Sequence, residues 1–160
     1  MPTRKIQNPT PLRGVHVRNK RASRDYFILE SFEAGIRLLG SEVKSVRLGR
    51  VTLEQSFARV LGGEAFLVNA HIAPYQHAKD DKYQPARTRQ LLLHKKQIDS
   101  LNGKLASQGA TLIPISIYEK NNLIKVQLGL GKSKKQFDKR RVMKERDHKR
   151  RIDQELRGKV

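Results

Sequence analysis

The side chains best able to do chemistry in this sequence are cations gathered near its C-terminal end. Residues 132–151, KSKKQFDKRRVMKERDHKRR, contain eleven Lys or Arg and three acids. Ammonium and guanidinium groups at this density suit phosphate, so the pattern indicates a polyanionic partner. The run has too few apolar side chains to build a core. On its own we expect it to be disordered or a fraying helix.

The same arm is able to become helical over residues 138–157. Asp138 is a plausible N-cap, and neither Pro nor Gly interrupts the run before Gly158. Acidic residues stand four positions before basic ones at Glu145–Lys149, Asp147–Arg151 and Glu155–Lys159. The sequence therefore predicts an arm that folds as a helix when it meets nucleic acid.

Charge is distributed unevenly along the 160 residues. The formal net charge of +19 divides into +7 for residues 1–24, +4 for residues 25–131 and +8 for residues 132–160. A nearly balanced body with a basic arm at each end favours a phosphate-rich partner. A membrane surface is the competing polyanion, but neither arm has a wide apolar face and no apolar run could span a bilayer. We therefore expect a soluble, cytoplasmic protein without a membrane partner.

Patterns typical of enzymes or metal sites are missing from the sequence. Gly131-Lys132-Ser133 resembles the end of a phosphate-binding loop, but Val126 stands where the motif needs its first glycine. Cysteine is absent, and the five histidines show no ligand spacing. His71 and His77 near Asp80-Asp81 are better explained by a solvated loop. We expect no catalytic residues, no metal and no cofactor.

The elements that must position the cations form a mainly β body. The predicted strands are residues 26–29, 36–39, 57–61, 65–72, 112–118 and 123–130, with turns at 33–35, 62–63 and 121–122. A short helix capped by Ser41 and a second containing Ile98, Leu101 and Leu105 are inserted between them. This order predicts a small antiparallel barrel of the oligonucleotide-binding type. The expected divisions are a disordered basic leader (1–18), an RNA-binding barrel (19–131) and a basic C-terminal tail (132–160).

Aromatic side chains offer two kinds of role. Phe27 and Phe66 lie in predicted strands and are expected in the core. Tyr75, Tyr83 and Phe137 lie outside clear strands and are candidates for stacking on unpaired bases.

Blocks of residues carry a resemblance to a known family. These are NKRASRDYFILESFEAGI (19–36), GSEVKSVRLGRV (40–51), EAFLVNAHIAPY (64–75), RTRQLLLHKKQID (87–99), IKVQLGLGKSKKQFDKR (124–140) and KERD (144–147). Together they resemble the SmpB family, the bacterial SsrA-binding proteins that are partners of transfer-messenger RNA. About four-fifths of the chain takes part.

The resemblance implies an adaptor for trans-translation. The barrel would hold the tRNA-like domain of transfer-messenger RNA, and the tail would probe the empty mRNA channel beside 16S ribosomal RNA in the A site of a stalled ribosome. Elongation factor Tu and alanyl-tRNA synthetase would be met indirectly, through the charged RNA. The free protein would be a monomer and would make or break no bond.

Residues are assigned by position from this resemblance. Glu33, Leu92 and Lys125 match the RNA-contact positions: Lys125 suits phosphate, Glu33 can accept from amino groups or 2′-hydroxyls, and Leu92 suits either contact or packing. The ribosome-contact positions are Lys134, Lys135, Phe137, Asp138, Lys139, Arg140, Lys144, Arg146, Lys149 and Arg150. Ser133 stands where the family commonly has glycine, and the family varies at Phe137.

Two other classes of protein also have basic arms. An RNA-processing enzyme would need a catalytic set, and the sequence offers none. A structural ribosomal protein would keep its arms threaded through rRNA, and it would stay on ribosomes at high salt where a transient factor dissociates.

Overall fold

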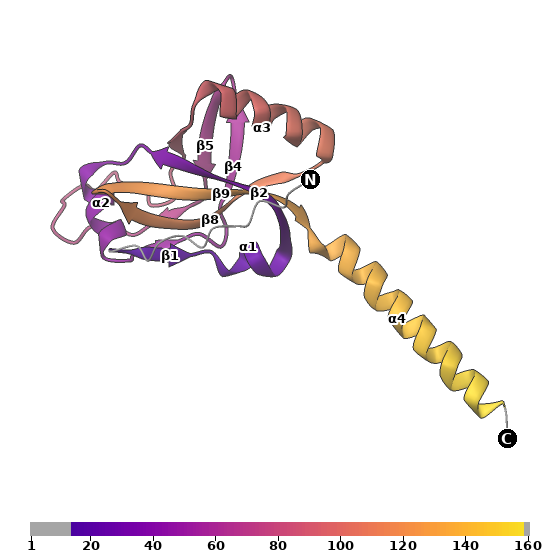
Figure 1. Ribbon diagram of the computed structural model, residues 1–160. Coiled ribbons are helices and arrows are strands. Elements are labelled where there is room, and N and C mark those ends of the chain that lie inside the picture. Colours follow the sequence, from indigo (N-terminus) through magenta and orange to yellow (C-terminus); the bar gives the residue numbers. More distant parts are fainter. Residues whose placement is uncertain (1–13, 159–160) are drawn as a thin grey trace.

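The computed structural model describes residues 14–158, apart from the side chains of residues 135–140 and 142. The strands are β1 (His16–Arg18), β2 (Tyr26–Ile36), β3 (Val51–Thr52), β4 (Phe57–Leu61), β5 (Glu64–Val68), β6 (His71–Ile72), β7 (Arg89–Leu92), β8 (Thr111–Lys120) and β9 (Leu123–Ser133). The helices are α1 (Lys20–Asp25), α2 (Gly40–Arg47), α3 (Lys95–Gln108) and α4 (Lys134–Arg157). Figure 1 shows α4 leaving the body directly from the end of β9.

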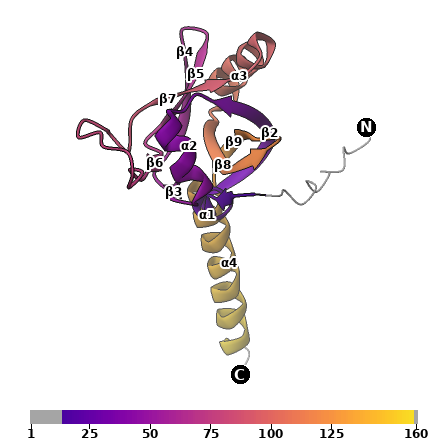
Figure 2. The same ribbon diagram turned by 90° about the vertical axis from the view of Figure 1, so that its left-hand side faces the viewer.

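Seven strands form one antiparallel sheet in the order β1-β8-β4-β5-β7-β2-β9. An additional β8–β9 pairing returns the sheet to its second strand, so six strands surround the core and β1 extends the wall. Figure 2 shows β2, β8 and β9 curving around this core. The predicted antiparallel barrel with inserted helices is confirmed. The described residues form nine strands in all, counting β1 and the short pair β3 and β6, where six were expected.

Strand β2 corrects the prediction of two strands joined by a turn at residues 33–35. It is a single strand of 11 residues that pairs with β9 along its length and with β7 at its end. A register shift between Ile28 and Glu30 marks a bulge. Gly35 lies inside the paired region. A glycine is needed there because the Leu92 side chain packs closely over it, and not because the chain turns.

Alternating side chains fill the core as the sequence predicted for β9. Ile124, Val126, Leu128 and Leu130 are all buried. The turns at Gly62-Gly63 and Asn121-Asn122 have positive φ at both residues, the geometry that matches a two-residue hairpin to the strand twist.

Two phenylalanines that were predicted to lie in the core, Phe27 and Phe66, are not fully buried. Phe27 is 45% exposed and pairs with the exposed Lys132, in a part of β2 where Ile28 and Leu29 are exposed as well. Phe66 is half-buried, while its neighbours Ala65 and Leu67 point inward and are fully covered.

Helix α2 is fixed to the barrel by a buried acid. Its N-cap is Leu39 rather than the predicted Ser41, and the Leu39 N–H donates to Glu42 Oε1 at 2.8 Å. Glu42 also accepts from Arg87 and, at 2.6 Å, from Arg89 Nε. Arg89 is fully buried and donates in addition to the carbonyls of Ala70 and Pro85. This network fastens the loop before β7.

The N-terminal part of the chain joins the barrel earlier than predicted. Residues 16–18, assigned to the disordered leader, form β1 and pair with Ser116–Tyr118 of β8. Asn19 caps the unpredicted helix α1, and its side-chain amide donates to the Pro114 carbonyl at 2.8 Å. The rest of the predicted leader, residues 1–13, lies outside the described residues.

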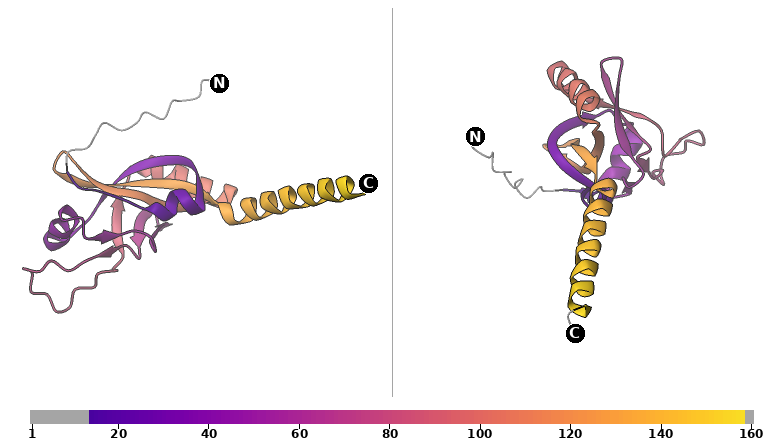
Figure 3. Two further views of the ribbon diagram at one scale, coloured as in Figure 1. Left: turned by 90° about the horizontal axis from the view of Figure 1, so that it is seen from below. Right: turned by 90° about the vertical axis from the view of Figure 1, so that its right-hand side faces the viewer.

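The C-terminal tail is a continuous helix of 24 residues, whereas disorder or a fraying helix was predicted for it alone. It begins at Lys134, so Asp138 lies in its interior and is not the predicted N-cap. The run from Lys134 to Arg157 has neither Gly nor Pro, which permits an unbroken helix. Figure 3 shows the helix projecting away from the barrel.

Candidate nucleic-acid interface

One cross-strand row brings two of the predicted RNA-contact residues together. Gly35 of β2 pairs with Leu92 of β7 on one side and with Lys125 of β9 on the other. Paired residues of neighbouring strands present their side chains on the same face of a sheet. Leu92 therefore lies on the outer face and is 48% exposed, although its neighbour Leu91 is buried.

Gly35 is required by the side chain that lies over it. A Cβ at this position would be 3.1 Å from the Leu92 Cβ and 3.4 Å from its Cδ1. The glycine thus allows the leucine to lie flat across β2 beside Lys125.

Glu33 stands two residues before Gly35, on the same face of β2. Its carboxylate accepts from the Tyr118 hydroxyl and from Lys120 Nζ, the latter at 3.3 Å. The Tyr118 hydrogen bond lowers the pKa of Glu33 despite the opposing effect of burial, and Lys120 and Lys125 lower it further. Glu33 is therefore an ionised acceptor at neutral pH, with lone pairs left for a ligand.

A groove of about 920 Å³ connects these residues. It lies between the Gly35 row, the Gly62-Gly63 turn and the first turn of α3, and its lining includes Glu33, Leu92, Lys125, Gln90, His94, Lys95 and Gln97. The structure thus brings all three predicted RNA-contact residues to one groove. Sequence reasoning missed Lys95; the signal was a pair of lysines, Lys95-Lys96, at the start of a predicted helix.

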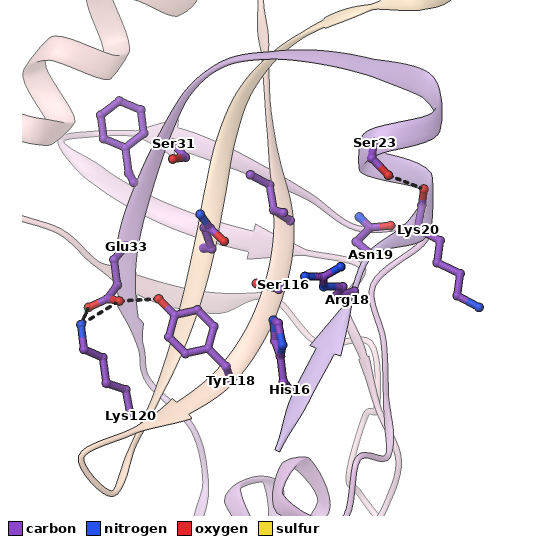
Figure 4. A pocket seen from close by; sticks show the side chains of 13 residues that line it. His16, Arg18, Asn19, Lys20, Ser23, Ser31, Glu33, Ser116, Tyr118 and Lys120 are labelled. Carbon is purple, nitrogen blue, oxygen red and sulfur yellow. Dashed lines mark hydrogen bonds and ion pairs between the residues drawn. The ribbon is translucent and has the colours of Figure 1, made fainter. Parts of the chain in front are cut away.

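A second hollow lies on the other side of Glu33, toward β1, and we call it the trough. Its volume is about 750 Å³. Figure 4 shows Ser116 and Tyr118 of β8 and His16 and Arg18 of β1 around it, with Glu33 bound to Tyr118 and Lys120. Placing residues 1–18 in a leader hid its β1 wall. The alternation of Val15 and Val17 with His16 and Arg18 was the available signal.

These hollows contain acceptors, donors and cations but no recognisable catalytic set. In the part of the chain whose side chains are described, no group of three or more His, Asp or Glu could hold a metal ion. No described helix is long and apolar enough to cross a membrane.

A comparison with protein families identifies the group to which the sequence belongs. The family model of the SmpB protein matches residues 16–158, nearly the whole described chain. The chain belongs to the SmpB family.

Members of the SmpB family with curated names are similar over most of their lengths. The SsrA-binding protein of Halalkalibacterium halodurans is 50% identical over 91% of this chain and 94% of its own. That of Bacillus licheniformis is 51% identical over 87% of this chain and 88% of its own. A solved chain described as "tmRNA-SmpB: a journey to the center of the bacterial ribosome" matches with a TM-score of 0.64 and 47% identity, covering 75% of this chain and 85% of that one.

The tail residues assigned from the SmpB resemblance fall into three groups. Lys134 is held at the barrel: its Nζ donates to the Ser23 carbonyl at 2.9 Å and lies 5.1 Å from the centre of the Phe27 ring. The side chains of Lys135, Phe137, Asp138, Lys139 and Arg140 lie outside the described residues. Lys144, Arg146, Lys149 and Arg150 are exposed on α4; at 100° per residue Arg146, Lys149 and Arg150 share one face of the helix and Lys144 lies on the opposite side.

Among the described side chains of α4, neither Glu145–Lys149 nor Asp147–Arg151 forms the predicted ion pair, and Lys159 of the third predicted pair lies outside the described residues. Arg141 Nε lies 3.6 Å from Glu145 Oε1, with the base before the acid. Both side chains are largely exposed, so this pair adds little to the stability of α4.

Proposed function

We propose that this chain binds the tRNA-like domain of transfer-messenger RNA through the groove beside Gly35 and brings that RNA to stalled ribosomes. The observation that carries the proposal is the convergence of Glu33, Leu92 and Lys125, distant in sequence, on one groove. Family membership supports it, because curated relatives are named SsrA-binding proteins and the description of a solved relative names tmRNA-SmpB and the bacterial ribosome.

Each groove residue has a separate role in this proposal. Lys125 lies at the edge of the groove, where its ammonium can meet a phosphate. Leu92 offers an exposed apolar surface to a ribose or a base. Glu33 accepts from base amino groups or from 2′-hydroxyls, which distinguish RNA from DNA.

The tail supplies the ribosomal half of the function in our proposal. A helix with exposed cations on opposite sides is suited to a channel lined by RNA, because phosphates can then be met on more than one side of it. We propose that Lys144, Arg146, Lys149 and Arg150 meet ribosomal RNA in the empty mRNA channel, and that Lys135, Phe137, Asp138, Lys139 and Arg140 lie nearer the decoding centre. Elongation factor Tu and alanyl-tRNA synthetase would interact only with the charged RNA, and this chain would catalyse no step.

Gel-shift titrations of the full chain and of residues 1–133 test the proposal. The truncation keeps Ser133 because β9 extends that far and pairs with Tyr26. Both proteins should bind transfer-messenger RNA with similar affinity and ordinary tRNA more weakly. Equal affinity for the two RNAs, or loss of binding on truncation with the barrel still folded, would contradict it.

A further inference from the structure

The outer face of the sheet has a second cross-strand row beside the Gly35 row, and we call it the arginine row. Arg59 of β4 pairs with Phe66 of β5, and Phe66 pairs with Gln90 of β7. The row ends at Arg37 of β2, whose backbone N–H donates to the Gln90 carbonyl at 2.9 Å. The chain neighbours of Phe66 and of Gln90 are fully buried, so the row itself faces away from the core. Figure 2 shows β4, β5 and β7 side by side at one edge of the barrel.

The arginine row is continuous with the proposed RNA groove. Gln90 lies two residues before Leu92 on β7, and Arg37 lies two residues after Gly35 on β2. Residues two apart on a strand share one face of the sheet, so the two rows are neighbours on the same surface. Gln90 belongs to the row and also lines the groove. An RNA that fills the groove therefore lies beside the arginine row.

The two arginines carry charge that the barrel does not neutralise. Arg37 and Arg59 are exposed, and neither side chain has an ion pair or a hydrogen bond among the described residues. Arg47, also exposed, is different, because its Nε lies 3.3 Å from Glu119 Oε1. A guanidinium group has five N–H donors in a planar fork that matches a phosphate, and the arginine row contains no acid. Both groups are thus available to a phosphate.

The sheet sets the separation of these two charges. Strands β4 and β2 are three steps apart in the sheet order, so Arg59 and Arg37 are separated by about 14 Å at the backbone. Side chains stand roughly perpendicular to a sheet, so the two arginines meet different phosphates. Between them, Phe66 and Gln90 are half-buried and keep part of a ring and an amide accessible. An apolar ring beside an amide suits a ribose with its 2′-hydroxyl.

We propose that the arginine row binds the sugar–phosphate backbone of the same RNA strand that lies in the groove. Arg37 and Arg59 each hold one phosphate, and Phe66 and Gln90 lie beneath the ribose groups between them. Contacts of this kind add affinity and fix orientation without reading a base. An acidic protein segment has related chemistry, but the shared lining of Gln90 favours RNA. This inference rests on the proposed function and extends its contact surface across β7 and β5.

Removing the arginine charges in the full chain tests the row. R37Q and R59Q should each reduce the slope of log affinity for transfer-messenger RNA against log salt by about 0.7–0.9, and the double variant by about twice that. R37K and R59K keep the charge and should keep the slope. R157Q removes an exposed arginine near the end of α4, outside the barrel, and should leave the slope unchanged. None of these variants should lower the melting temperature, because the side chains are exposed.

The same titrations separate failure of the row from failure of the proposed function. An unchanged slope in the double variant, or an equal loss in R157Q, would overturn the row. Unchanged RNA binding together with lost binding of polyglutamate would assign the row to an acidic protein instead. If L92A and K125A weaken RNA binding while the double variant does not, the row is wrong and the proposed function stands. If none of these variants affects RNA binding, both are wrong.

Discussion

Leu92 and Lys125 pair with the same residue, Gly35, from opposite sides of β2. An apolar side chain and a cation from strands β7 and β9 are thereby fixed on one face, with the Glu33 carboxylate two residues away along β2. The spacing between them is set by the sheet itself rather than by a loop. A rigid arrangement of this kind loses little conformational entropy on binding.

Substitution of Gly35 by Ala tests whether this close approach matters. The new Cβ would lie 3.1 Å from the Leu92 Cβ, so Leu92 must move outward from β2. We expect RNA affinity to fall several-fold while the melting temperature changes little, because an exposed leucine can move. G103A is the control, since a Cβ at Gly103 in α3 would meet nothing within 4 Å. Unchanged affinity in G35A would show that Leu92 is not a contact.

Removal of the Lys125 charge tests whether it meets phosphate. K125A should weaken RNA binding and reduce the slope of log affinity against log salt by about 0.7–0.9, the change expected for one lost phosphate contact. Binding measured at several salt concentrations gives this slope. K82A, which removes an exposed lysine from the loop before β7, should leave the slope as it is. An unaltered slope in K125A would exclude a phosphate contact.

The Tyr118–Glu33 hydrogen bond should make the stability of the fold depend on pH through the pKa of Glu33. Because this bond is the largest cause of the lowered Glu33 pKa, Y118F should raise that pKa toward its ordinary value, as measured by carboxyl NMR titration. A lowered carboxyl pKa stabilises the fold above the ordinary value of 4.5, and the stabilisation is lost as pH falls through the folded value. Y118F should therefore reduce stability more at pH 7 than in acid. Y83F, at a hydroxyl that binds Glu42 instead, should leave the Glu33 pKa alone.

Loss of the buried ion pair between Arg89 and Glu42 should lower the free energy of unfolding far more than loss of an exposed charge. The two side chains are fully buried, with Arg89 Nη2 2.5 Å from Glu42 Oε2. Burial alone would raise the pKa of Glu42, but hydrogen bonds from Arg87, Leu39 and Arg89 outweigh it and lower the pKa. R89M removes one partner and should cost about 3–5 kcal/mol in urea unfolding. R59M, at an exposed arginine, should change stability by less than about 0.5 kcal/mol. A cost for R89M as small as that of R59M would refute this role.

Local patterns predicted the hairpins, the α3 helix and the core face of β9, because their signals are turn residues and strict alternation. The turn at residues 33–35 was wrong because glycine also occurs where a neighbouring side chain crosses a strand, as Leu92 crosses Gly35. Phe27, Ile28 and Leu29 are all exposed at the start of β2, so their burial follows no alternation that a local pattern could have revealed. Strand β1 has only three residues and derives its stability from β8, so propensity alone could not find it.

The candidate site was predictable in its residues but not in its geometry. Glu33, Leu92 and Lys125 came from a family resemblance, whereas their convergence depends on the order β7-β2-β9 in the sheet. The trough was missed because residues 16–18, which form its β1 wall, were assigned to the leader.

A tagging assay on ribosomes stalled without a stop codon tests the central division of labour most directly. Residues 1–133 retain the whole barrel and lack α4. We predict that this protein binds transfer-messenger RNA as tightly as the full chain does but supports no tagging. Tagging at the full-length level by the truncated protein would contradict the account, because the helix would then have no part in recognising the vacant channel.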